Sequence, residues 1–423
     1  MRRLPLFFII IFYCGLLFGQ RISERKLLHK IKNIPELSRA FIGISISDLD
    51  SDKSLASLNE DRYMTPGSNI KLLTFLASIQ TFSKIPALEY FEENDTITYF
   101  RSTGYPLLLH PFYPDTTLFK FFKEKSRWTY HPADNKPSQL GPGWSWDDYN
   151  NYYSASRSVF PIYGNSVRGV LDGYDIELTP LFNYEKDSII RNFKREQSEN
   201  KFKYNPKKWK TKDTIYRPFI PSDSIFIRLL RESTETQVSL TNKKDSLEWK
   251  TLYTGNEELI YKGILRDSDN GIAEALLLMI ANKKEGAFKT EVAIDSLINN
   301  WESWLPDKPE WVDGSGVSRY NMLTPRTLVS VLQKIDQEIP FETIQTFFPK
   351  SGISGTLKSY KGLKNVYAKT GTLRHNYALS GYLLSSKGKR FTFSIMVNHF
   401  TESKNQIQKG VTELLVWLQQ KLK

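Results

Sequence analysis

The sequence predicts an α/β (α+β) fold in which helices pack on an antiparallel sheet and a β-rich domain is inserted. Three observations favour this fold. A β-hairpin pattern lies near the start of the chain, and three further strand patterns followed by a long helix end it. Between them, the aromatic-dense residues 86–255 have only short strand patterns. We therefore expect residues 20–85 and 256–423 to form one domain and residues 86–255, called here the inserted segment, to form another.

The expected elements follow from two periodicities, alternation for strands and a spacing of three to four residues for helices. The strands expected outside the inserted segment are residues 41–49, 54–59, 367–373, 378–384 and 390–397. The helices are residues 22–32, 69–82, 270–282, 325–335 and 403–422. Within the inserted segment, residues 169–171 and 224–227 have the composition of short strands. Pro66 and Gly67 are boundary residues, so Ser68 is expected at a helix N-terminus.

The first twenty residues have the pattern of a secretory signal peptide. Arg2 and Arg3 precede an almost wholly apolar run of about 15 residues, and Leu17-Phe18-Gly19 resembles a cleavage site. A spanning helix needs roughly 20 apolar residues. We therefore expect residues 1–19 to be removed on export to the periplasm or cell envelope. The alternatives are retention as a membrane anchor and lipid attachment at Cys14.

Composition disfavours several kinds of site. Cys14 is the only cysteine, so the processed chain would have no disulfide, cysteine nucleophile or thiolate metal site. The five histidines are not at ligand spacing and no Gly-rich nucleotide loop occurs, so no metal or other cofactor is expected. For an exported protein, the net charge of +12 fits a polyanionic envelope or peripheral contact with an anionic membrane better than nucleic acid. A soluble basic surface explains the charge equally well.

A serine and a lysine three residues apart form the first candidate pattern. Residues at this spacing share a helix face, so Lys71 can reach the hydroxyl of Ser68. A serine becomes a good nucleophile when a base takes its proton. A lysine whose pKa is lowered by burial or by a second cation, here Lys369, can be that base. Ser23 and Lys26 have the same spacing, so this pattern alone is weak.

The second pattern, Ser268-Asp269-Asn270, opens the helix expected after the inserted segment. Ser and Asp are preferred helix caps, so capping alone explains these residues. In the catalytic interpretation, Ser268 relays a proton toward the leaving amine. Asn270 then donates a hydrogen bond to the amide carbonyl of the substrate, and can also contact Lys71.

The third pattern, Lys369-Thr370-Gly371-Thr372, lies on an expected strand. Its ordinary interpretation is an exposed edge strand with one lysine. In the catalytic interpretation, this strand pairs with an extended peptide substrate. Lys369 and Thr370 then face the substrate carboxylate, and Gly371 permits close approach of the backbone. The N–H of Thr372 joins that of Ser68 in an oxyanion hole.

The three patterns, in this order, resemble the signature of penicillin-binding proteins and class A β-lactamases. Further stretches extend the likeness to the D-alanyl-D-alanine carboxypeptidase/endopeptidase family, the class C low-molecular-mass penicillin-binding proteins. The stretches are residues 66–72, 268–270, 313–319, 352–357, and 368–373 with 379–382. Residues 141–148 resemble part of the inserted domain of that family. Gly67 precedes the nucleophile where the family usually has alanine.

The resemblance implies a serine β-lactamase/transpeptidase-like domain and a serine D-alanyl-D-alanine carboxypeptidase that also has D,D-endopeptidase activity. It implies that Ser68 is acylated, that Lys71 is its base, and that residues 313–319 form a structural turn near the site. Peptidoglycan stem peptides are then substrates, and β-lactams are covalent inhibitors. A serine β-lactamase or esterase is one alternative, although no Glu-x-x-Leu-Asn segment follows the nucleophile helix. A non-catalytic wall-binding scaffold is another, although every motif residue is intact.

Overall fold

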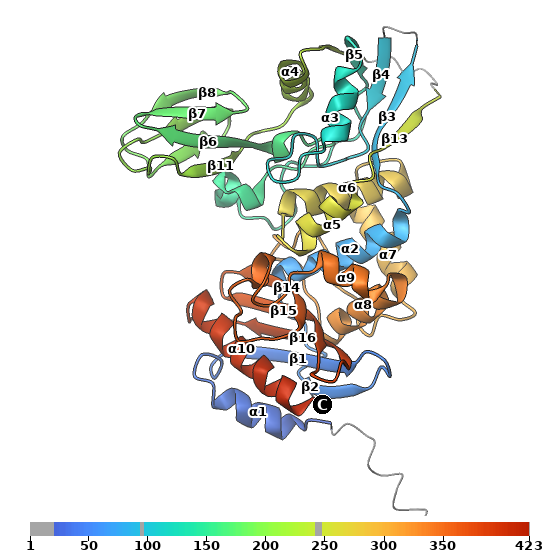
Figure 1. The fold of residues 1–423 in the computed structure, drawn as a ribbon, viewed down its shortest axis with the longest axis vertical. Helices are drawn as coiled ribbons and strands as arrows, with labels where there is room; N and C mark the ends of the chain where they lie inside the picture. Colours follow the sequence, from blue (N-terminus) through green and yellow to red (C-terminus); the bar gives the residue numbers. More distant parts are fainter. Residues whose placement is uncertain (1–20, 94–96, 242–247, 423) are drawn as a thin grey trace, which may run out of the picture.

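A five-stranded antiparallel sheet, in the order β14-β15-β16-β1-β2, forms the lower half of the molecule (Figure 1). The computed structural model describes residues 21–93, 97–241 and 248–422, so the expected signal peptide, residues 1–19, lies outside the described residues. The strands are β1 (Phe41–Asp48), β2 (Ser54–Leu58), β14 (Val366–Leu373), β15 (Asn376–Leu384) and β16 (Arg390–Asn398). Strands from both ends of the chain meet where β1 pairs with β16. The expected α/β fold with an antiparallel sheet is confirmed.

Helices cover both faces of this sheet (Figure 1). The alternation of Ile42, Ile44 and Ile46 along β1 buries all three in the core that α10 closes. This face carries α1 (Glu24–Lys32) and α10 (Lys404–Lys421). The other face and the layer above it contain α2 (Lys71–Thr81), α5 (Glu257–Leu265), α6 (Asn270–Glu285), α7 (Thr290–Trp301), α8 (Pro325–Glu338) and α9 (Phe341–Phe347).

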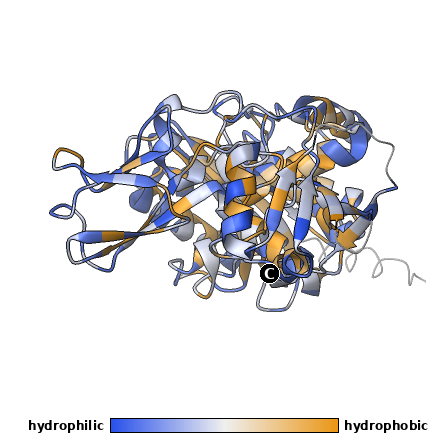
Figure 2. Cartoon of the chain, turned by 90° about the horizontal axis from the view of Figure 1, so that it is seen from above, coloured by the Kyte–Doolittle hydropathy of each residue, from blue (hydrophilic) through white to orange (hydrophobic). Residues whose placement is uncertain are grey.

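The inserted segment is β-rich, as expected, and lies above the helical layer (Figure 1). One sheet has the order β12-β5-β4-β3-β13. Its elements are β3 (Pro86–Glu92), β4 (Ile97–Arg101), β5 (Arg127–Tyr130), β12 (Gln237–Leu240) and β13 (Lys250–Tyr253), with α3 (Thr116–Lys123) and α4 (Asp223–Thr234). A projecting arm holds β6 (Ser166–Asp172), β7 (Asp175–Thr179), β8 (Asn183–Lys186), β9 (Phe193–Arg195), β10 (Lys201–Tyr204) and β11 (Thr214–Pro218). Hydrophobic and hydrophilic residues are mixed along this arm (Figure 2).

One strand prediction in the inserted segment is wrong. Residues 224–227 belong to the helix α4, whose first turn is capped by the hydroxyl of Ser222 accepting a hydrogen bond from the Ile225 N–H at 3.2 Å. A short apolar run does not distinguish a buried strand from the start of a helix. The buried stripe continues to Leu229 and Leu230, and this helical spacing decides the structure.

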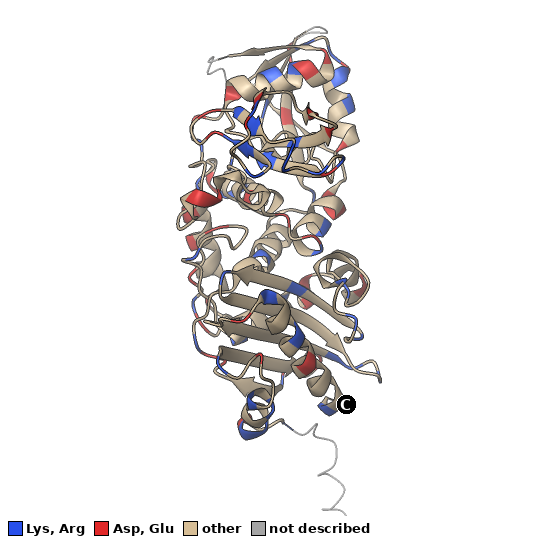
Figure 3. Ribbon diagram, turned by 90° about the vertical axis from the view of Figure 1, so that its left-hand side faces the viewer, with Lys and Arg blue, Asp and Glu red and all other residues tan. Residues whose placement is uncertain are grey.

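Positions of Lys and Arg and positions of Asp and Glu are interspersed along the ribbon in the view of Figure 3. Among the helices of the described residues, none combines the length and the apolar character that crossing a membrane requires.

Candidate active site

Ser68 lies on a tight 3-10 turn, Gly67–Ile70, that leads directly into α2. The helix expected here is confirmed, but its first turn is narrower than an α-helix. Gly67 has a φ of 52°, in the left-handed region, and a Cβ atom there would lie 2.9 Å from the backbone nitrogen of Thr372. The glycine that replaces the usual alanine of the family therefore lets the nucleophile turn approach β14 closely.

The amine of Lys71 is enclosed by three oxygen atoms. Its Nζ lies 3.0 Å from Ser68 Oγ, 2.6 Å from Asn270 Oδ1 and 2.6 Å from the carbonyl oxygen of Ser315. A neutral amine has two N–H donors and one lone pair. If the two shorter contacts take the N–H donors, the lone pair faces the Ser68 hydroxyl, as a general base requires.

Burial also changes the charge state of the two lysines of the site. It lowers the pKa of Lys71 to about 8, although nearby carboxylates, first Asp313 and then Glu274 and Asp269, oppose the shift. Burial lowers the pKa of Lys369 well below that of an ordinary lysine, and repulsion from Lys71 lowers it further. The positive charge of Lys71 thus acts on Lys369, whereas burial is what lowers the pKa of Lys71 itself.

Lys369 reaches the second motif from the edge strand β14. Its Nζ donates to Ser268 Oγ at 2.7 Å and to the carbonyl oxygen of Thr370, also at 2.7 Å. Ser268 has a φ of 63°, which is uncommon for a residue with a side chain. This backbone conformation, at the start of α6, accompanies the hydrogen bond between the serine hydroxyl and the lysine.

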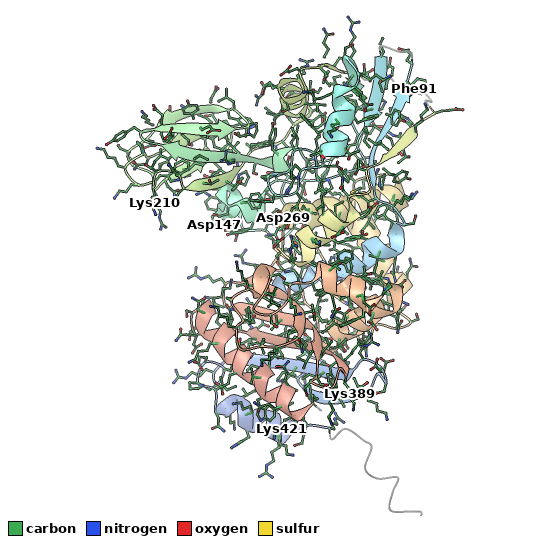
Figure 4. The ribbon with its side chains drawn as sticks, in the orientation of Figure 1. Phe91, Asp147, Lys210, Asp269, Lys389 and Lys421 are labelled. Atoms are coloured by element: carbon green, nitrogen blue, oxygen red, sulfur yellow. The ribbon has the colours of Figure 1, made fainter. Side chains whose placement is uncertain are left out.

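The motif Ser268-Asp269-Asn270 combines a helix cap with contacts to the two lysines of the site. Asp269 caps α6, because its Oδ1 accepts the N–H of Ile272 at 2.9 Å. Asn270 faces Lys71, and its Nδ2 also donates to the carbonyl oxygen of Tyr153 at 2.7 Å. The Asn270 amide group, which was expected to donate to the substrate, therefore already donates one of its two N–H groups to the inserted segment. Figure 4 labels Asp269 and Asp147 near the junction of the inserted segment and the helices.

Gly371 allows β14 to contact the nucleophile turn. A Cβ atom at this position would lie 2.2 Å from the carbonyl oxygen of Pro66 and 3.0 Å from the backbone nitrogen of Ser68. The N–H groups of Ser68 and Thr372 are therefore neighbours, as an oxyanion hole requires. Thr370 is half-buried and Thr372 is exposed, on the outermost strand of the sheet. From the sequence, Gly371 was expected to allow a close approach of the substrate; in the structure, it is the backbone of the nucleophile turn that approaches Gly371 closely.

Several side chains around Lys71 were not among the site residues predicted from sequence. Asp313 is fully buried and accepts hydrogen bonds from backbone N–H groups of its own turn and from Trp144 Nε1, the latter at 2.9 Å. Tyr152 donates its O–H to Asp269 Oδ2 at 2.7 Å. The stretches 141–148 and 313–319 were noticed as resemblances, but nothing in the sequence pairs them. The turn at 313–319 does lie at the site, because Ser315 contacts Lys71.

The curated proteins that are similar to parts of this chain include two carboxypeptidases. The D-alanyl-D-alanine carboxypeptidase DacB of Haemophilus influenzae is 30% identical over 152 residues, which cover 34% of this chain and 32% of that protein. The penicillin-sensitive carboxypeptidase A of Dictyostelium discoideum is 28% identical over 120 residues, which cover 25% of this chain and 23% of that protein. The matched stretch is thus a third or less of either relative.

Solved structures match over nearly the whole chain. Penicillin binding protein 4 (dacB) from Haemophilus influenzae has a TM-score of 0.74 and 17% identity, and the match covers 95% of this chain and 99% of that one. A predatory peptidoglycan endopeptidase from Bdellovibrio bacteriovorus has a TM-score of 0.53 and 12% identity, with 91% and 94% covered. These structures share the fold.

A sequence model of one family covers both parts of the chain that carry the three motifs. The D-Ala-D-Ala carboxypeptidase 3 (S13) family matches residues 24–85 and 257–420. These residues include all three motifs, and the resemblance noted in the sequence is confirmed. The chain therefore belongs to the D-Ala-D-Ala carboxypeptidase 3 (S13) family.

Proposed function

We propose that this chain is a serine-type D-alanyl-D-alanine carboxypeptidase, and also a D,D-endopeptidase, acting on peptidoglycan stem peptides and their cross-links. The observation that carries the proposal is the 3.0 Å contact between Lys71 Nζ and Ser68 Oγ, made by a buried lysine. The names of the relatives support it, because DacB is called a carboxypeptidase and the Bdellovibrio neighbour an endopeptidase. The S13 family itself is described by the same carboxypeptidase activity.

In the first step, Ser68 Oγ attacks the carbonyl carbon of the penultimate D-alanine. Lys71, as the free amine, takes the hydroxyl proton. The oxygen that becomes negative accepts hydrogen bonds from the backbone N–H groups of Ser68 and Thr372. Lys369 and Thr370 bind the terminal carboxylate, which fixes the register of the peptide beside β14.

In the second step, the terminal D-alanine, or the donor amine of a cross-link, leaves as the C–N bond breaks. The proton that Lys71 took from Ser68 is passed to this amine through Ser268, so Lys71 returns to the free-amine form. The Ser268 hydroxyl accepts a hydrogen bond from Lys369 at 2.7 Å. An acyl ester on Ser68 remains. Water then attacks the ester carbon and Lys71 accepts a proton from that water. As the bond between the acyl carbon and Ser68 Oγ breaks, Lys71 gives this proton to Oγ, which restores the serine and the free amine.

The wider assignments follow from the same function. We propose that residues 20–85 and 256–423 form the catalytic domain and residues 86–255 the inserted domain, because the family match stops at residue 85 and resumes at 257. We also propose export to the periplasm after removal of residues 1–19. β-lactams are expected to acylate Ser68, and a related structure is described as a complex with a β-lactam.

The decisive experiment compares wild type with Ser68→Ala on purified peptidoglycan peptides, with released D-alanine and split cross-links measured. Only the wild type should release either product. Ser83→Ala is the matched control, because Ser83 is exposed just beyond the end of α2. Equal release by wild type and Ser68→Ala would contradict the mechanism.

A fluorescent penicillin separates the alternatives. A stable adduct that maps to Ser68 supports the carboxypeptidase. Rapid turnover of the penicillin would favour a β-lactamase or esterase on the same fold. A protein that is not labelled at all would favour a non-catalytic scaffold.

A further inference from the structure

Glu274 is a buried carboxyl group that contacts the neighbourhood of Lys71 through one backbone residue. It lies one turn after Asn270 on α6, so both side chains lie on the same side of the helix. Glu274 Oε1 accepts the N–H of Ser315 at 2.8 Å, and the carbonyl oxygen of Ser315 accepts from Lys71 at 2.6 Å. The side chain is 2% exposed. Glu274 thus holds the residue that orients the amine.

The other oxygen of the Glu274 carboxyl group lies near a buried cation but is not hydrogen-bonded to it. Glu274 Oε2 has no hydrogen-bond partner among the described residues and lies 3.8 Å from Nη1 of the buried Arg157. Arg157 is held by Ser138, whose carbonyl oxygen accepts from its Nε at 3.0 Å. Burial raises the pKa of Glu274 to about 7, and the negative charge of Asp313 acts in the same direction.

Charged and titratable groups from several elements surround the pair of Glu274 and Lys71. They are Arg157 and His110 of the inserted segment, Asp269 at the cap of α6, Asp313 in the turn before α8, and Lys369 on β14. His110 lines the same small cavity as Glu274 and Arg157, and burial lowers its pKa. The negative charge of Glu274 is among the charges that hold a proton on Lys71.

We propose that Glu274 is a positioning residue that fixes Ser315 against Lys71 and titrates with that lysine as a coupled pair. This inference rests on the proposed function, in which Lys71 must lose its proton before Ser68 can attack. While Glu274 is ionised, it favours the charged lysine. When Glu274 binds a proton, the free amine becomes easier to form, so the pair titrates over a broad pH range.

The test is Glu274→Gln, which keeps an oxygen acceptor for the Ser315 N–H and removes the charge. The titration of Lys71 is followed in the full-length protein by NMR of isotope-labelled lysine side chains, with Lys71→Arg used for assignment. The midpoint of Lys71 should fall by about half a unit to one unit, and its curve should become steeper. The two proteins should converge below about pH 6, where the wild-type carboxyl group is already protonated.

Glu285→Gln is the matched control, because Glu285 is exposed at the far end of the same helix. It should leave the Lys71 titration unchanged. Glu274→Ala removes the acceptor as well, so penicillin acylation should fall about tenfold or more at every pH, whereas Glu274→Gln should retain most of the maximal rate. An unchanged Lys71 midpoint in Glu274→Gln would overturn the proposal.

A reciprocal measurement covers the case in which Glu274→Gln does not fold. Coupling between two binding sites is mutual, so Lys71→Gln should raise the midpoint of the Glu274 carboxyl by a similar amount. A Glu274 midpoint that is the same in both proteins would also overturn the proposal. If penicillin does not label the wild type, the proposed function fails, but these NMR titrations still decide whether the two side chains are coupled.

Discussion

The contact between β14 and the nucleophile turn can be tested with one methyl group. In Gly371→Ala, the new Cβ atom would lie 2.2 Å from the carbonyl oxygen of Pro66 and 3.0 Å from the nitrogen of Ser68. Both neighbours are backbone atoms, which cannot rotate away as the end of a flexible side chain can. The strand and the turn must therefore separate by about 1 Å to reach ordinary van der Waals contact.

That separation sets the size of the expected effect. The N–H groups of Ser68 and Thr372 must converge on one oxygen, and a displacement of about 1 Å takes one of them beyond hydrogen-bond distance. Loss of one oxyanion donor costs about a hundredfold to a thousandfold in rate. Overpacking of a tight contact also costs about 1–3 kcal/mol of stability. We therefore expect acylation to slow at least about a hundredfold while the protein remains folded.

The assay is the second-order rate of acylation by a fluorescent penicillin, with the free energy of unfolding measured by urea denaturation. Gly362→Ala is the control, because Gly362 is exposed and a Cβ atom there would meet only Thr412 Cγ2, at 3.6 Å. It should behave as wild type in both measurements. Acylation of Gly371→Ala at the wild-type rate would refute the assigned oxyanion hole.

Three further predictions test the groups around Lys71. The rate of acylation should rise with pH, with a midpoint near pH 8, because burial lowers the pKa of Lys71 to about 8 and only the free amine accepts a proton. A rate that does not change between about pH 6 and pH 9 would contradict the assignment of Lys71 as the base. Trp144→Phe removes a hydrogen bond to the buried Asp313 and should cost about 1.5–3 kcal/mol in urea unfolding, whereas Trp146→Phe, at a side chain 69% exposed, should cost almost nothing. Tyr152→Phe removes the hydrogen-bond donor to Asp269, so the free energy of unfolding should fall by about 1.5–3 kcal/mol and amide-exchange protection at the start of α6 should weaken. Tyr174→Phe is the control, because the Tyr174 side chain is 71% exposed; an equal loss in this variant would show that the contact with Asp269 is not the source of the stability.

The catalytic sheet was predictable because its strands have strong local patterns. Apolar and small residues alternate along residues 41–48. The three C-terminal strands are joined by short polar turns, so their pairing follows from chain order. The inserted segment had no such guide. Its strand β5 pairs in parallel with β12, which is more than 100 residues later, and only tertiary packing fixes that pairing. The error at residues 224–227 has a different cause, because the helical spacing of α4 is visible only when the apolar run is followed as far as Leu229 and Leu230.

The motif residues could be predicted together because the three motifs, at residues 68–71, 268–270 and 369–371, follow one another in the order of a known signature. Their mutual geometry was partly predictable, since the spacing of Ser68 and Lys71 follows from helical geometry alone. The role of Glu274 was not, because a glutamate inside a helix is usually exposed. Its burial depends on the turn at Ser315, which is 41 residues away in sequence.

Residues 144–157 of the inserted segment contribute to the site and face the three carboxylates around Lys71. The contacts are Trp144 Nε1 to Asp313 at 2.9 Å, the Tyr152 hydroxyl to Asp269 at 2.7 Å, and Arg157 Nη1 to Glu274 at 3.8 Å. Those three carboxylates are the charges that oppose the lowered pKa of Lys71. A donor or cation that satisfies a carboxylate reduces its pull on a neighbouring proton. The charges that act on the Lys71 amine therefore depend on the inserted segment as well as on the residues that carry the three motifs. A substitution within residues 144–157 should alter the rate of acylation, although none of these residues is Ser68.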